Sequence, residues 1–342
     1  MKDVTPIGLR KSEHIRINLE EDVRSGLTSG LEQYHFVHHA LPEINLSDVD
    51  PSVKLFGKPL STPILISSMT GGTSEASKIN QVLATAAQEM HIAMGVGSQR
   101  IALEHPEFAY TFKVRHVAPD ILLFANLGAI QLNYGYGISE CKHAIEMIEA
   151  DALVLHFNSL QEALQNEGDT KFALLIKKVE SICTALEVPV IAKEVGWGFS
   201  KQDISLLAQA GVKAIDVAGA GGTSWSQVEM HRAKNDYSRK LAAAFSDWGI
   251  PTAEVIENVI QVAPDLKIIA SGGLRTGIDI AKCVALGASL GGMAGPFLKT
   301  ASQSVDETIK MIKLIKEEIC ICMFATGSKT VEQLRQDKLV IK

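Results

Sequence analysis

The chain has 342 residues, of which 46% are hydrophobic and 21% charged, and this composition excludes an intrinsically disordered protein. Its formal net charge is −6, so no basic surplus indicates binding to nucleic acid or to an anionic membrane. No uncharged apolar run approaches the roughly 20 residues that cross a bilayer, and the N-terminus lacks the apolar core of a secretory signal. Five cysteines without framework spacing favour a reduced compartment, and we expect a cytoplasmic protein.

Residues 1–60 are polar, and we interpret them as an irregular, flexible N-terminal extension that contributes substrate-binding residues to a barrel domain at 61–342. Beyond residue 60, short runs rich in Val, Ile and Leu recur, each followed by a loop with Gly or Asn. Such runs are typical of buried parallel strands. The eight predicted strands are Pro63–Ser67, Ile92–Gly97, Ile121–Ala125, Ala152–His156, Pro189–Ala192, Ala214–Ala218, Lys267–Ala270 and Ser289–Met293.

The segments between these runs have helical periodicity. Examples are Lys78–Glu89, Cys141–Glu149, Thr170–Ala185, Lys201–Ala210 and Ile278–Leu286. Eight alternating units over about 250 residues predict an α/β fold of the TIM (β/α)8 barrel type rather than an open doubly wound sheet. The longest gap, from Gly219 to Pro264, predicts an insertion or a loop that covers substrate. A helix at Asp306–Leu314 is expected to close the barrel from outside.

Functional side chains of such barrels lie at the carboxyl ends of the strands. In this sequence, polar or glycine residues follow every predicted strand, which a purely structural barrel does not require. The segments are Ser68–Gly72, Ser98–Arg100, Asn126, His156–Glu162, Lys193–Glu194, Gly219–Trp225, Ser271–Arg275 and Ala294–Gly295.

The last two of these segments are candidates for a phosphate site. Gly272-Gly273 and Ala294-Gly295 are small residues ahead of predicted helices, where exposed backbone N–H groups bind phosphate. The alternative is a pair of tight turns that need glycine only for their backbone conformation.

Lys193 is a lone lysine at the end of an apolar run, where an unpaired ammonium is costly. Either it forms an ion pair with Glu194 or Glu162, or it contacts an electron-rich cofactor ring and stabilises its reduced anionic form.

The loop after the fourth strand contains Asn158, Gln161 and Glu162. Glu162 could hold Mg²⁺ on a diphosphate, and the amide of Gln161, which cannot titrate, could position or relay a proton. The alternative is a capped loop with a glutamate in the first helical turn.

Arg10 and Lys11 precede the barrel, and Arg100 follows the second strand. Together they could clamp a diphosphate, although a surface charge cluster is the usual explanation for a run such as Arg10-Lys11. The chain has no Gly-x-Ser-x-Gly or Walker A motif. A flavin 2-hydroxyacid oxidase would need a histidine in the loop after the sixth strand, and Ala218–Thr223 has none.

Seven motifs, in order from about residue 8 to residue 300, together resemble those of the FMN-dependent type 2 isopentenyl-diphosphate delta-isomerase family. They are Arg10-Lys11-x-x-His14, Met69–Gly72, Gly97–Arg100, Phe124–Gly128, Asn158-x-x-Gln161-Glu162, Lys193–Gly196 and Gly221–Trp225. Two departures are Phe157 and Ser159, where the family usually has Leu and Pro, and Ser67-Ser68, where Asn-Ala is common.

The resemblance implies a TIM barrel that uses reduced FMN and Mg²⁺, with NADPH as reductant, to interconvert isopentenyl and dimethylallyl diphosphate. It also implies a homotetramer or homo-octamer. In the implied mechanism, N5 of the reduced flavin delivers and accepts the proton while Lys193 keeps the flavin anionic. Whether Gln161 or flavin N5 is the immediate acid and base stays open. Two other hypotheses remain: a flavin oxidoreductase acting on a small acid or amide, and a non-catalytic phosphate- or flavin-binding barrel.

The resemblance also assigns residues. The FMN-binding set is Ser68, Met69, Thr70, Ser98, Asn126, Lys193, Thr223, Gly272, Gly273, Leu274, Arg275, Ala294 and Gly295. The substrate-binding set is Arg10, Lys11, His14, Ser98, Gln99, Arg100, His156, Asn158 and Gln161. The catalytic set is Gln161, Lys193, Trp225 and Glu229, and Glu162 is the implied Mg²⁺ ligand.

Overall fold

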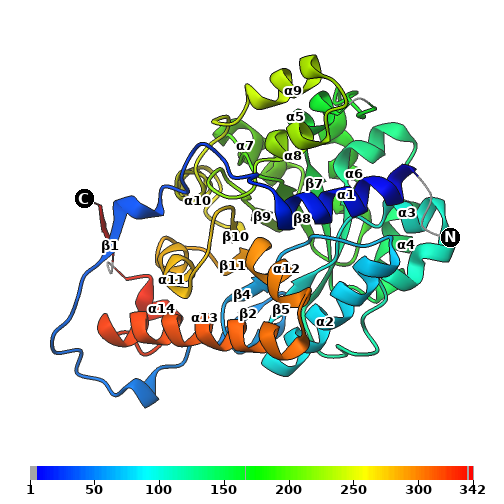
Figure 1. The fold of residues 1–342 in the computed structure, drawn as a ribbon. Coiled ribbons are helices and arrows are strands. Elements are labelled where there is room, and N and C mark those ends of the chain that lie inside the picture. The colour runs from blue at the N-terminus through cyan, green and yellow to red at the C-terminus, as the bar shows by residue number, and fades with distance from the viewer. Residues whose placement is uncertain (1–5, 166, 337–338, 342) are drawn as a thin grey trace.

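The computed structural model describes residues 6–165, 167–336 and 339–341, and its centre is a closed barrel of eight parallel strands (Figure 1). The TIM-barrel prediction is confirmed, because each predicted run overlaps one barrel strand and the ring closes in the order β10-β11-β4-β5-β6-β7-β8-β9. The strands are β4 (Ile64–Ile66), β5 (Ala93–Gly95), β6 (Leu123–Gly128), β7 (Ala152–Phe157), β8 (Val190–Glu194), β9 (Ala214–Asp216), β10 (Lys267–Ser271) and β11 (Leu290–Met293).

Both faces of these strands are buried, which is why they appear in the sequence as continuous apolar runs. Ile64 and Ile66 of β4 belong to the core between the barrel and the helices. Leu65, between them, points to the other face and joins Phe124 in the cluster inside the barrel. The alternation of strand side chains therefore divides the apolar residues into two layers.

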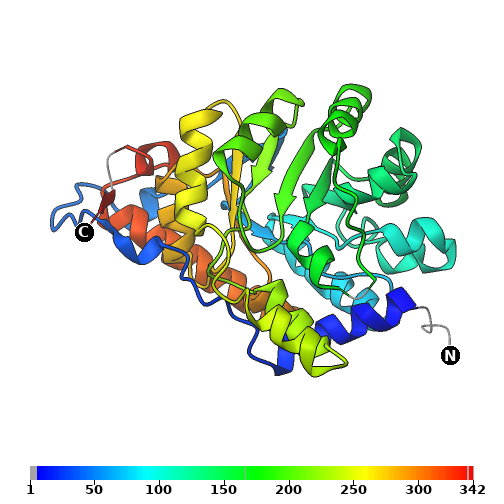
Figure 2. The ribbon, with the colours of Figure 1, turned by 90° about the horizontal axis from the view of Figure 1, so that it is seen from above.

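Thirteen α-helices follow the first one in the described residues and mostly surround the barrel (Figures 1 and 2). They are α2 (Ser74–Met90), α3 (Arg100–Glu104), α4 (Ile138–Ile148), α5 (Ser159–Leu164), α6 (Leu175–Ala185), α7 (Lys201–Gln209), α8 (Trp225–Arg232), α9 (Asp236–Ala243), α10 (Thr252–Val262), α11 (Gly277–Ala285), α12 (Gly295–Ala301), α13 (Val305–Ala325) and α14 (Val331–Leu334). The 3₁₀ helices are η1 (Leu31–Gln33), η2 (Leu46–Asp48), η3 (Pro106–Thr111) and η4 (Ala129–Tyr134).

Several of the longer helices begin at a side-chain cap that satisfies an otherwise unpaired backbone N–H. The hydroxyls of Thr73, Ser200, Thr276 and Ser304 accept these hydrogen bonds at α2, α7, α11 and α13. The closing helix predicted at Asp306–Leu314 lies within α13, which packs on α2 and α11 outside the barrel. None of the helices in the described residues is long and apolar enough to cross a membrane.

The expectation of an irregular, flexible N-terminal extension is wrong for Pro6–Glu20, which forms helix α1. Its Ile15 and Ile17 are buried, and α1 packs against α8 and α12. Figure 2 shows α1, in dark blue, beside the yellow-green helices of the long insertion. The helix is stabilised by distant parts of the chain, so local sequence did not reveal it. Residues 1–5 of the predicted extension lie outside the described residues.

Two small antiparallel pairs complete the fold. Strand β1 (Tyr34–Phe36) pairs with β12 (Leu339–Ile341). Strands β2 (Val53–Leu55) and β3 (Lys58–Leu60) form a hairpin whose Leu55 and Leu60 join the apolar cluster inside the barrel. Through these two leucines the hairpin packs against the barrel interior.

Candidate functional site

A cavity of about 510 Å³ lies at the carboxyl ends of the strands and receives residues from the segments after all eight of them. Helix α1 and residues from the 222–225 segment also contribute to its wall. The predicted site residues that line it are Arg10, Lys11, His14, Ser68, Met69, Thr70, Ser98, Arg100, Asn126, His156, Asn158, Gln161, Glu162, Lys193, Thr223, Trp225, Gly272, Gly273, Leu274, Arg275, Ala294 and Gly295. Most residues of this wall are therefore ones that the sequence predicted.

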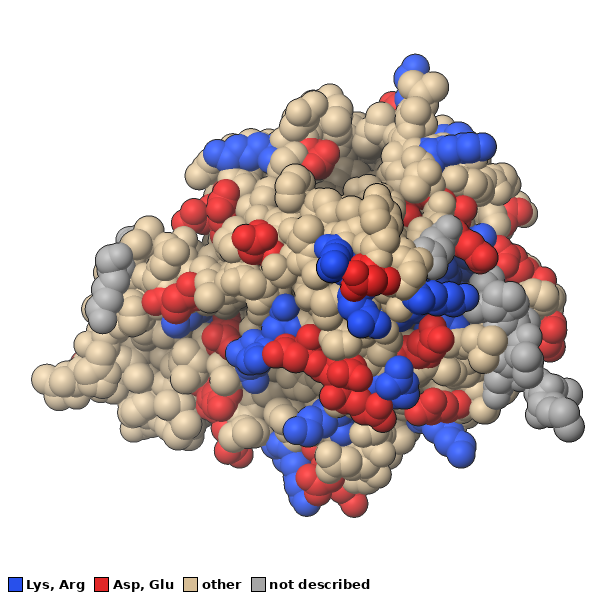
Figure 3. Space-filling view, turned by 45° about the horizontal axis from the view of Figure 1, so that its top comes forward, with Lys and Arg blue, Asp and Glu red and all other residues tan. Residues whose placement is uncertain are grey.

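The side chains that line the cavity include more cations than carboxylates. Among the described residues of its wall, one carboxylate, that of Glu162, accompanies six lysines and arginines. The face drawn in Figure 3 shows acidic and basic side chains interspersed, as expected for a chain of net charge −6. The cations are Arg10, Lys11, Arg24, Arg100, Lys193 and Arg275. Such concentration in a concave site favours an anionic ligand.

Several buried polar atoms in this wall have no hydrogen-bond partner. In the described part of the chain, five buried side-chain atoms have no hydrogen-bond partner, and three of them belong to cavity residues. They are Ser67 Oγ, Asn158 Oδ1 and His14 Nε2, which lies 3.6 Å from Glu229 Oε1. A buried unpaired polar atom costs about 1–3 kcal/mol. Their concentration at one cavity indicates that a polar ligand completes the site.

Lys193, at the end of β8, projects its ammonium to the cavity with a side chain only 11% exposed. Its Nζ donates to the backbone carbonyl of Glu194 at 3.0 Å and lies 3.4 Å from Oδ2 of Asp216 on β9. The carboxylate of Asp216 also accepts a 2.5 Å hydrogen bond from Ser271 Oγ. The expected carboxylate partners, Glu194 and Glu162, are wrong. A lone acid in the apolar run of β9 was the signal that sequence reasoning missed.

Glu194 instead organises the backbone that follows β8. Its Oε2 accepts N–H groups of Val195, Gly196 and Trp197 at 2.6–2.7 Å and that of Gly198 at 3.2 Å. Burial raises the pKa of this carboxyl to about 7, against the opposing effect of the backbone donors. The result is a fixed loop that places Val195 and Gly196 in the cavity wall.

The two predicted phosphate segments differ in what their glycines do. A Cβ on Gly272 (φ +104°) would lie 2.1 Å from the carbonyl oxygen of Gly219, so this turn needs glycine for backbone packing. A Cβ on Gly295 would meet no atom within 4 Å, and Gly295 lines the cavity where α12 begins. The turn interpretation thus describes Gly272, whereas the space beside Gly295 is open to a ligand.

The two predicted diphosphate-binding cations of α1 reach the cavity from above. Arg10 Nη1 donates to Gln165 Oε1 at 3.0 Å, and Lys11 Nζ donates to the carbonyl of Ser98 at 2.8 Å. Burial and the neighbouring Arg10 lower the pKa of Lys11 to about 7. The charge of Lys11 therefore depends on pH near neutrality.

Arg100 joins them from the segment after β5. Its Nη1 donates to Asp169 Oδ2 at 2.7 Å and its Nε to Glu104 Oε1 at 2.8 Å. The structure does not bring Gln99 to the cavity, although sequence reasoning grouped it with Arg100. The Gln99 side chain instead donates to the carbonyl of Ala144 and accepts from the backbone of Asn126.

Glu162 lies in the first turn of α5 and faces the cavity. Its two oxygens accept hydrogen bonds from Asn158 Nδ2 at 2.8 Å and from the backbone N–H of Asp169 at 2.6 Å. Among the described residues, no group of three or more His, Cys, Asp or Glu side chains could hold a metal. Glu162 could therefore hold a cation only together with oxygens of a ligand or water.

His156 and Asn126 meet at the ends of β7 and β6, with His156 Nδ1 2.8 Å from Asn126 Oδ1. Burial and the charges of Lys193 and Lys11 lower the pKa of His156 to about 4. The ring is neutral near pH 7, and because an amide oxygen only accepts, this contact assigns its proton to Nδ1.

Gln161 and Glu229 are also in contact, through a 3.3 Å hydrogen bond from Gln161 Nε2 to Glu229 Oε1. Glu229 lies behind the cavity wall rather than in it. His14 packs edge-on against Trp225, with ring centroids 5.0 Å apart. The two departures from the motif pattern change local packing: Ser159 begins α5, and Phe157 stacks edge-on against Phe199.

Residues 138–341 match a family model described as FMN-dependent dehydrogenase. Over 327 residues the chain is 54% identical to the isopentenyl-diphosphate delta-isomerase of Nostoc sp. (strain PCC 7120 / SAG 25.82 / UTEX 2576), which covers 95% of this chain and 93% of that protein. It is 50% identical over 331 residues to the protein of the same name from Rickettsia prowazekii (strain Madrid E), covering 97% of each.

Solved structures with the same fold have much lower identity. Mandelate oxidase with benzoyl-formic acid superposes with a TM-score of 0.65 at 17% identity, covering 97% of this chain and 93% of that one. A mutant flavocytochrome b2 with pyruvate bound gives 0.67 at 16% identity, covering 97% and 82%. These likenesses concern the architecture alone.

Proposed function

The chain belongs to the FMN-dependent, type 2 isopentenyl-diphosphate delta-isomerase family, and on that premise we propose that it interconverts isopentenyl diphosphate and dimethylallyl diphosphate at the barrel mouth. The observation that carries the proposal is the cavity with six cations and one carboxylate. Both the cofactor and the substrate carry phosphate groups, and both need such a site.

The residues of the cavity fit FMN. Its volume of about 510 Å³ is within the usual range for cofactor sites. The open space beside Gly295 allows a phosphate to approach backbone N–H groups, while the unpaired Ser67 Oγ needs a polar partner. Lys193 would place its charge beside the isoalloxazine ring. The residues proposed to hold FMN are Ser68, Met69, Thr70, Ser98, Asn126, Lys193, Thr223, Gly272, Gly273, Leu274, Arg275, Ala294 and Gly295.

The cavity also fits Mg²⁺ in the way that this ion usually binds. Mg²⁺ retains waters and takes one or two carboxylates plus substrate phosphates, and Glu162 is the one carboxylate found among the described wall residues. We propose that Glu162 holds Mg²⁺ on the substrate diphosphate, with Asn158 fixing the carboxylate through its 2.8 Å hydrogen bond.

Isomerisation requires a proton to be added to one carbon of the substrate and another to be removed from a second carbon. Bound reduced FMN would supply an electron-rich ring and an exchangeable proton. Arg10, Lys11 and Arg100 bind the diphosphate, which fixes the reacting carbons at a set distance from the charged end of the substrate. His156 and Asn158 lie on the same wall and contribute polar contacts to this end.

Gln161 is proposed to position the reacting part of the substrate, because its amide stays neutral at every pH. Its hydrogen bond to Glu229 fixes the orientation of that amide. Trp225 and His14 belong to the wall and exclude water from the region where positive charge develops on carbon. Water in that place would capture the cationic carbon instead of allowing proton loss.

Deuterium incorporation tests the proposal. The protein would be mixed anaerobically with dithionite-reduced FMN, Mg²⁺ and isopentenyl diphosphate in deuterated buffer, and the allylic product followed by NMR. We expect dimethylallyl diphosphate that carries solvent deuterium. Absence of that product with FMN bound would contradict the proposal.

A second candidate function is favoured by the FMN-dependent dehydrogenase match: oxidation of a small hydroxy acid. The loop Ala218–Thr223 after β9 lacks the histidine that this reaction needs as a base. Anaerobic mixing of the protein containing oxidised FMN with candidate hydroxy acids separates the two functions. Prompt bleaching of the flavin would support the oxidoreductase.

We further propose NADPH as the reductant that primes FMN, and a homotetramer or homo-octamer as the assembly. Leu314 and Ile321 on the outer side of α13 are more than half exposed, as expected where another subunit packs. Light scattering coupled to size exclusion would give the assembly mass, and anaerobic mixing with NADPH would reveal flavin reduction by loss of absorbance.

A further inference from the structure

Arg232, near the end of α8, joins two carboxylates on different helices. Its Nη1 donates to Glu229 Oε2 at 2.6 Å, one helical turn back on α8. Its Nε donates to Glu13 Oε2 at 3.1 Å on α1. The Arg232 side chain is 19% exposed and that of Glu229 only 4%, so the arm to Glu229 is shielded from solvent. The arm to Glu13 ends on a side chain that is 53% exposed, where solvent weakens an ion pair.

The second oxygen of Glu229 continues the same network to the cavity. Glu229 Oε1 accepts the 3.3 Å hydrogen bond from Gln161 Nε2 and lies 3.6 Å from His14 Nε2. Burial acts to raise the pKa of Glu229, but the effects of His14 and of the Arg232 charge outweigh it, so the pKa lies below its usual range. Glu229 is therefore ionised, and Arg232 is the arginine that balances it.

Helix α1 contacts this network through Glu13 and His14. The helix carries Arg10, Lys11 and His14 in the cavity wall. A second contact between α8 and the chain just after α1 joins His231 to Glu21 at 3.8 Å, which is longer than the 3.1 Å contact of Arg232 with Glu13. An apolar contact of Ile17 and Val23 with Val228 also holds this region against α8. Removing Arg232 would thus leave α1 attached but less precisely placed.

We infer that Arg232 is a positioning residue, which holds α1 over the cavity through Glu13 and orients Gln161 through Glu229. The inference rests on the proposed function for the role of Gln161, whereas the placement of α1 is independent of any reaction. Loss of the guanidinium leaves a buried carboxylate without its cation, which commonly costs more than loss of an exposed pair.

Three variants separate the two arms of the bridge. Arg232→Met removes both arms, Arg232→Lys retains the charge without the fork of donors, and Glu13→Ala cuts only the arm to α1. Arg16→Met is the matched control, because Arg16 lies on the same helix, is 53% exposed and pairs with Glu20 one turn along α1. Each variant would be measured by hydrogen exchange of α1 amides without substrate, and by kcat and KM with reduced FMN and Mg²⁺.

We expect Arg232→Met to speed exchange in α1 by about tenfold and to lower kcat by about 10- to 100-fold, as for loss of hydrogen bonds to a charged group. Arg232→Lys should show smaller changes in both the exchange rate and kcat. Glu13→Ala should speed exchange in α1 but keep kcat within about threefold of the parent. Arg16→Met should change neither the exchange rate nor kcat. If Arg232→Met does not fold, Arg232→Lys and Glu13→Ala still test whether Arg232 positions α1 and Gln161.

Parental exchange rates in α1 for the Arg232 and Glu13 variants would overturn the positioning of α1. Parental kcat in Arg232→Met would overturn the link to Gln161. The exchange result does not depend on catalysis, so absence of isomerase activity in every variant would count against the proposed function and leave the placement of α1 to be judged by exchange alone.

Discussion

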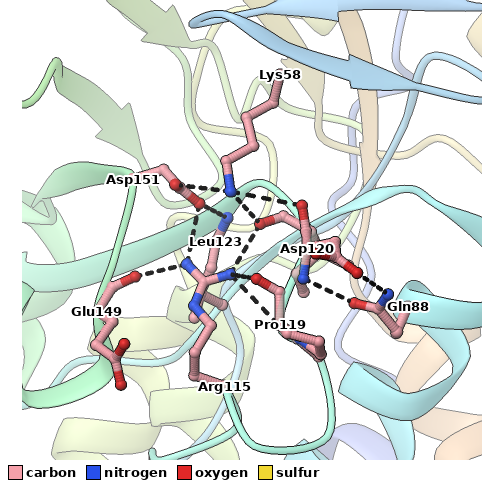
Figure 4. Close-up of polar contacts among 10 residues, drawn as sticks. Lys58, Gln88, Arg115, Pro119, Asp120, Leu123, Glu149 and Asp151 are labelled. Atoms are coloured by element: carbon pink, nitrogen blue, oxygen red, sulfur yellow. Dashed lines mark hydrogen bonds and ion pairs between the residues drawn. The ribbon is translucent and has the colours of Figure 1, made fainter.

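At the amino end of the barrel Arg115 is surrounded by acceptors, whereas at the carboxyl end six cations share the cavity wall with one carboxylate. Arg115 donates to the carbonyls of Ile121 and Glu149, among others, and to Asp151 Oδ2 at 3.0 Å. Lys58 reaches the same carboxylate at 3.0 Å from the β2–β3 hairpin. Figure 4 shows these side chains converging on Asp151.

The difference separates stability from binding within one fold. At the amino end, Arg115, Lys58 and Asp151 pair with one another and with backbone groups near the start of β6. Each of these charged side chains therefore already has partners within the protein. At the carboxyl end, a wall with more cations than carboxylates and several buried polar atoms without a hydrogen-bond partner are kept at a cost in stability. Proteins retain such arrangements where a ligand completes them.

The largest effect that tests this comparison is expected at the amino end of the barrel. Arg115→Met should lower the free energy of unfolding by about 4 kcal/mol, because Asp151 and several carbonyls lose their donor together. Chemical denaturation would measure this change. The activity of the remaining folded protein should stay at the parental value, and a lower kcat for folded protein would contradict the division between the two ends.

At the carboxyl end, Gln161→Ala should lower kcat by about 100-fold, or about 3 kcal/mol, since misplacement near the reacting carbons reduces turnover more than binding. KM should change by less than about threefold. Steady-state kinetics with reduced FMN would test it, and full kcat in this variant would refute the role of Gln161. Its unfolding free energy should fall less than that of Arg115→Met, by about 1–3 kcal/mol, because Glu229 Oε1 loses the Gln161 donor.

Arg100→Ala should raise KM by about 30-fold, or about 2 kcal/mol, because charge-assisted hydrogen bonds to the diphosphate are lost. The value of kcat should change much less. Arg16→Met serves as a control for loss of one positive charge outside the cavity wall. An unchanged KM for Arg100→Ala would remove this residue from the substrate clamp.

The smallest effect concerns pH. Lys11 has a pKa of about 7, so it is charged below and neutral above that value. Its bond to the diphosphate therefore weakens as pH rises, and kcat/KM should fall about fivefold between pH 7 and pH 8 from this group alone. Lys11→Arg, which stays charged, should flatten that limb of the profile. An identical profile for both proteins would exclude Lys11 as its origin.

The sequence predicted the barrel and most of the cavity wall, because both depend on local patterns. Apolar runs mark the strands, and a polar or glycine segment after each strand marks the mouth. It did not predict helix α1, whose Ile15 and Ile17 are covered by distant elements. Nor did it find Arg232 or pair Lys193 with Asp216, since ion pairs across 20 or more positions leave no spacing pattern.

Gln99 is a residue that the sequence placed in the substrate site but that does not reach the cavity. Its place between Ser98 and Arg100 suggested a diphosphate contact, yet its side chain bonds Ala144 and Asn126 instead. A short loop can present alternate residues to a cavity and to the core, and only the backbone path decides which.

The central claim is that this cavity uses FMN in its reduced state for a reaction without net redox change. The most direct measurement follows dimethylallyl diphosphate formation and flavin absorbance together, in one anaerobic sample, before and after FMN is reduced. The account predicts many turnovers per flavin only after reduction, with no reoxidation of the flavin. Equal turnover with oxidised FMN or without FMN, or one flavin oxidised per product, would contradict it.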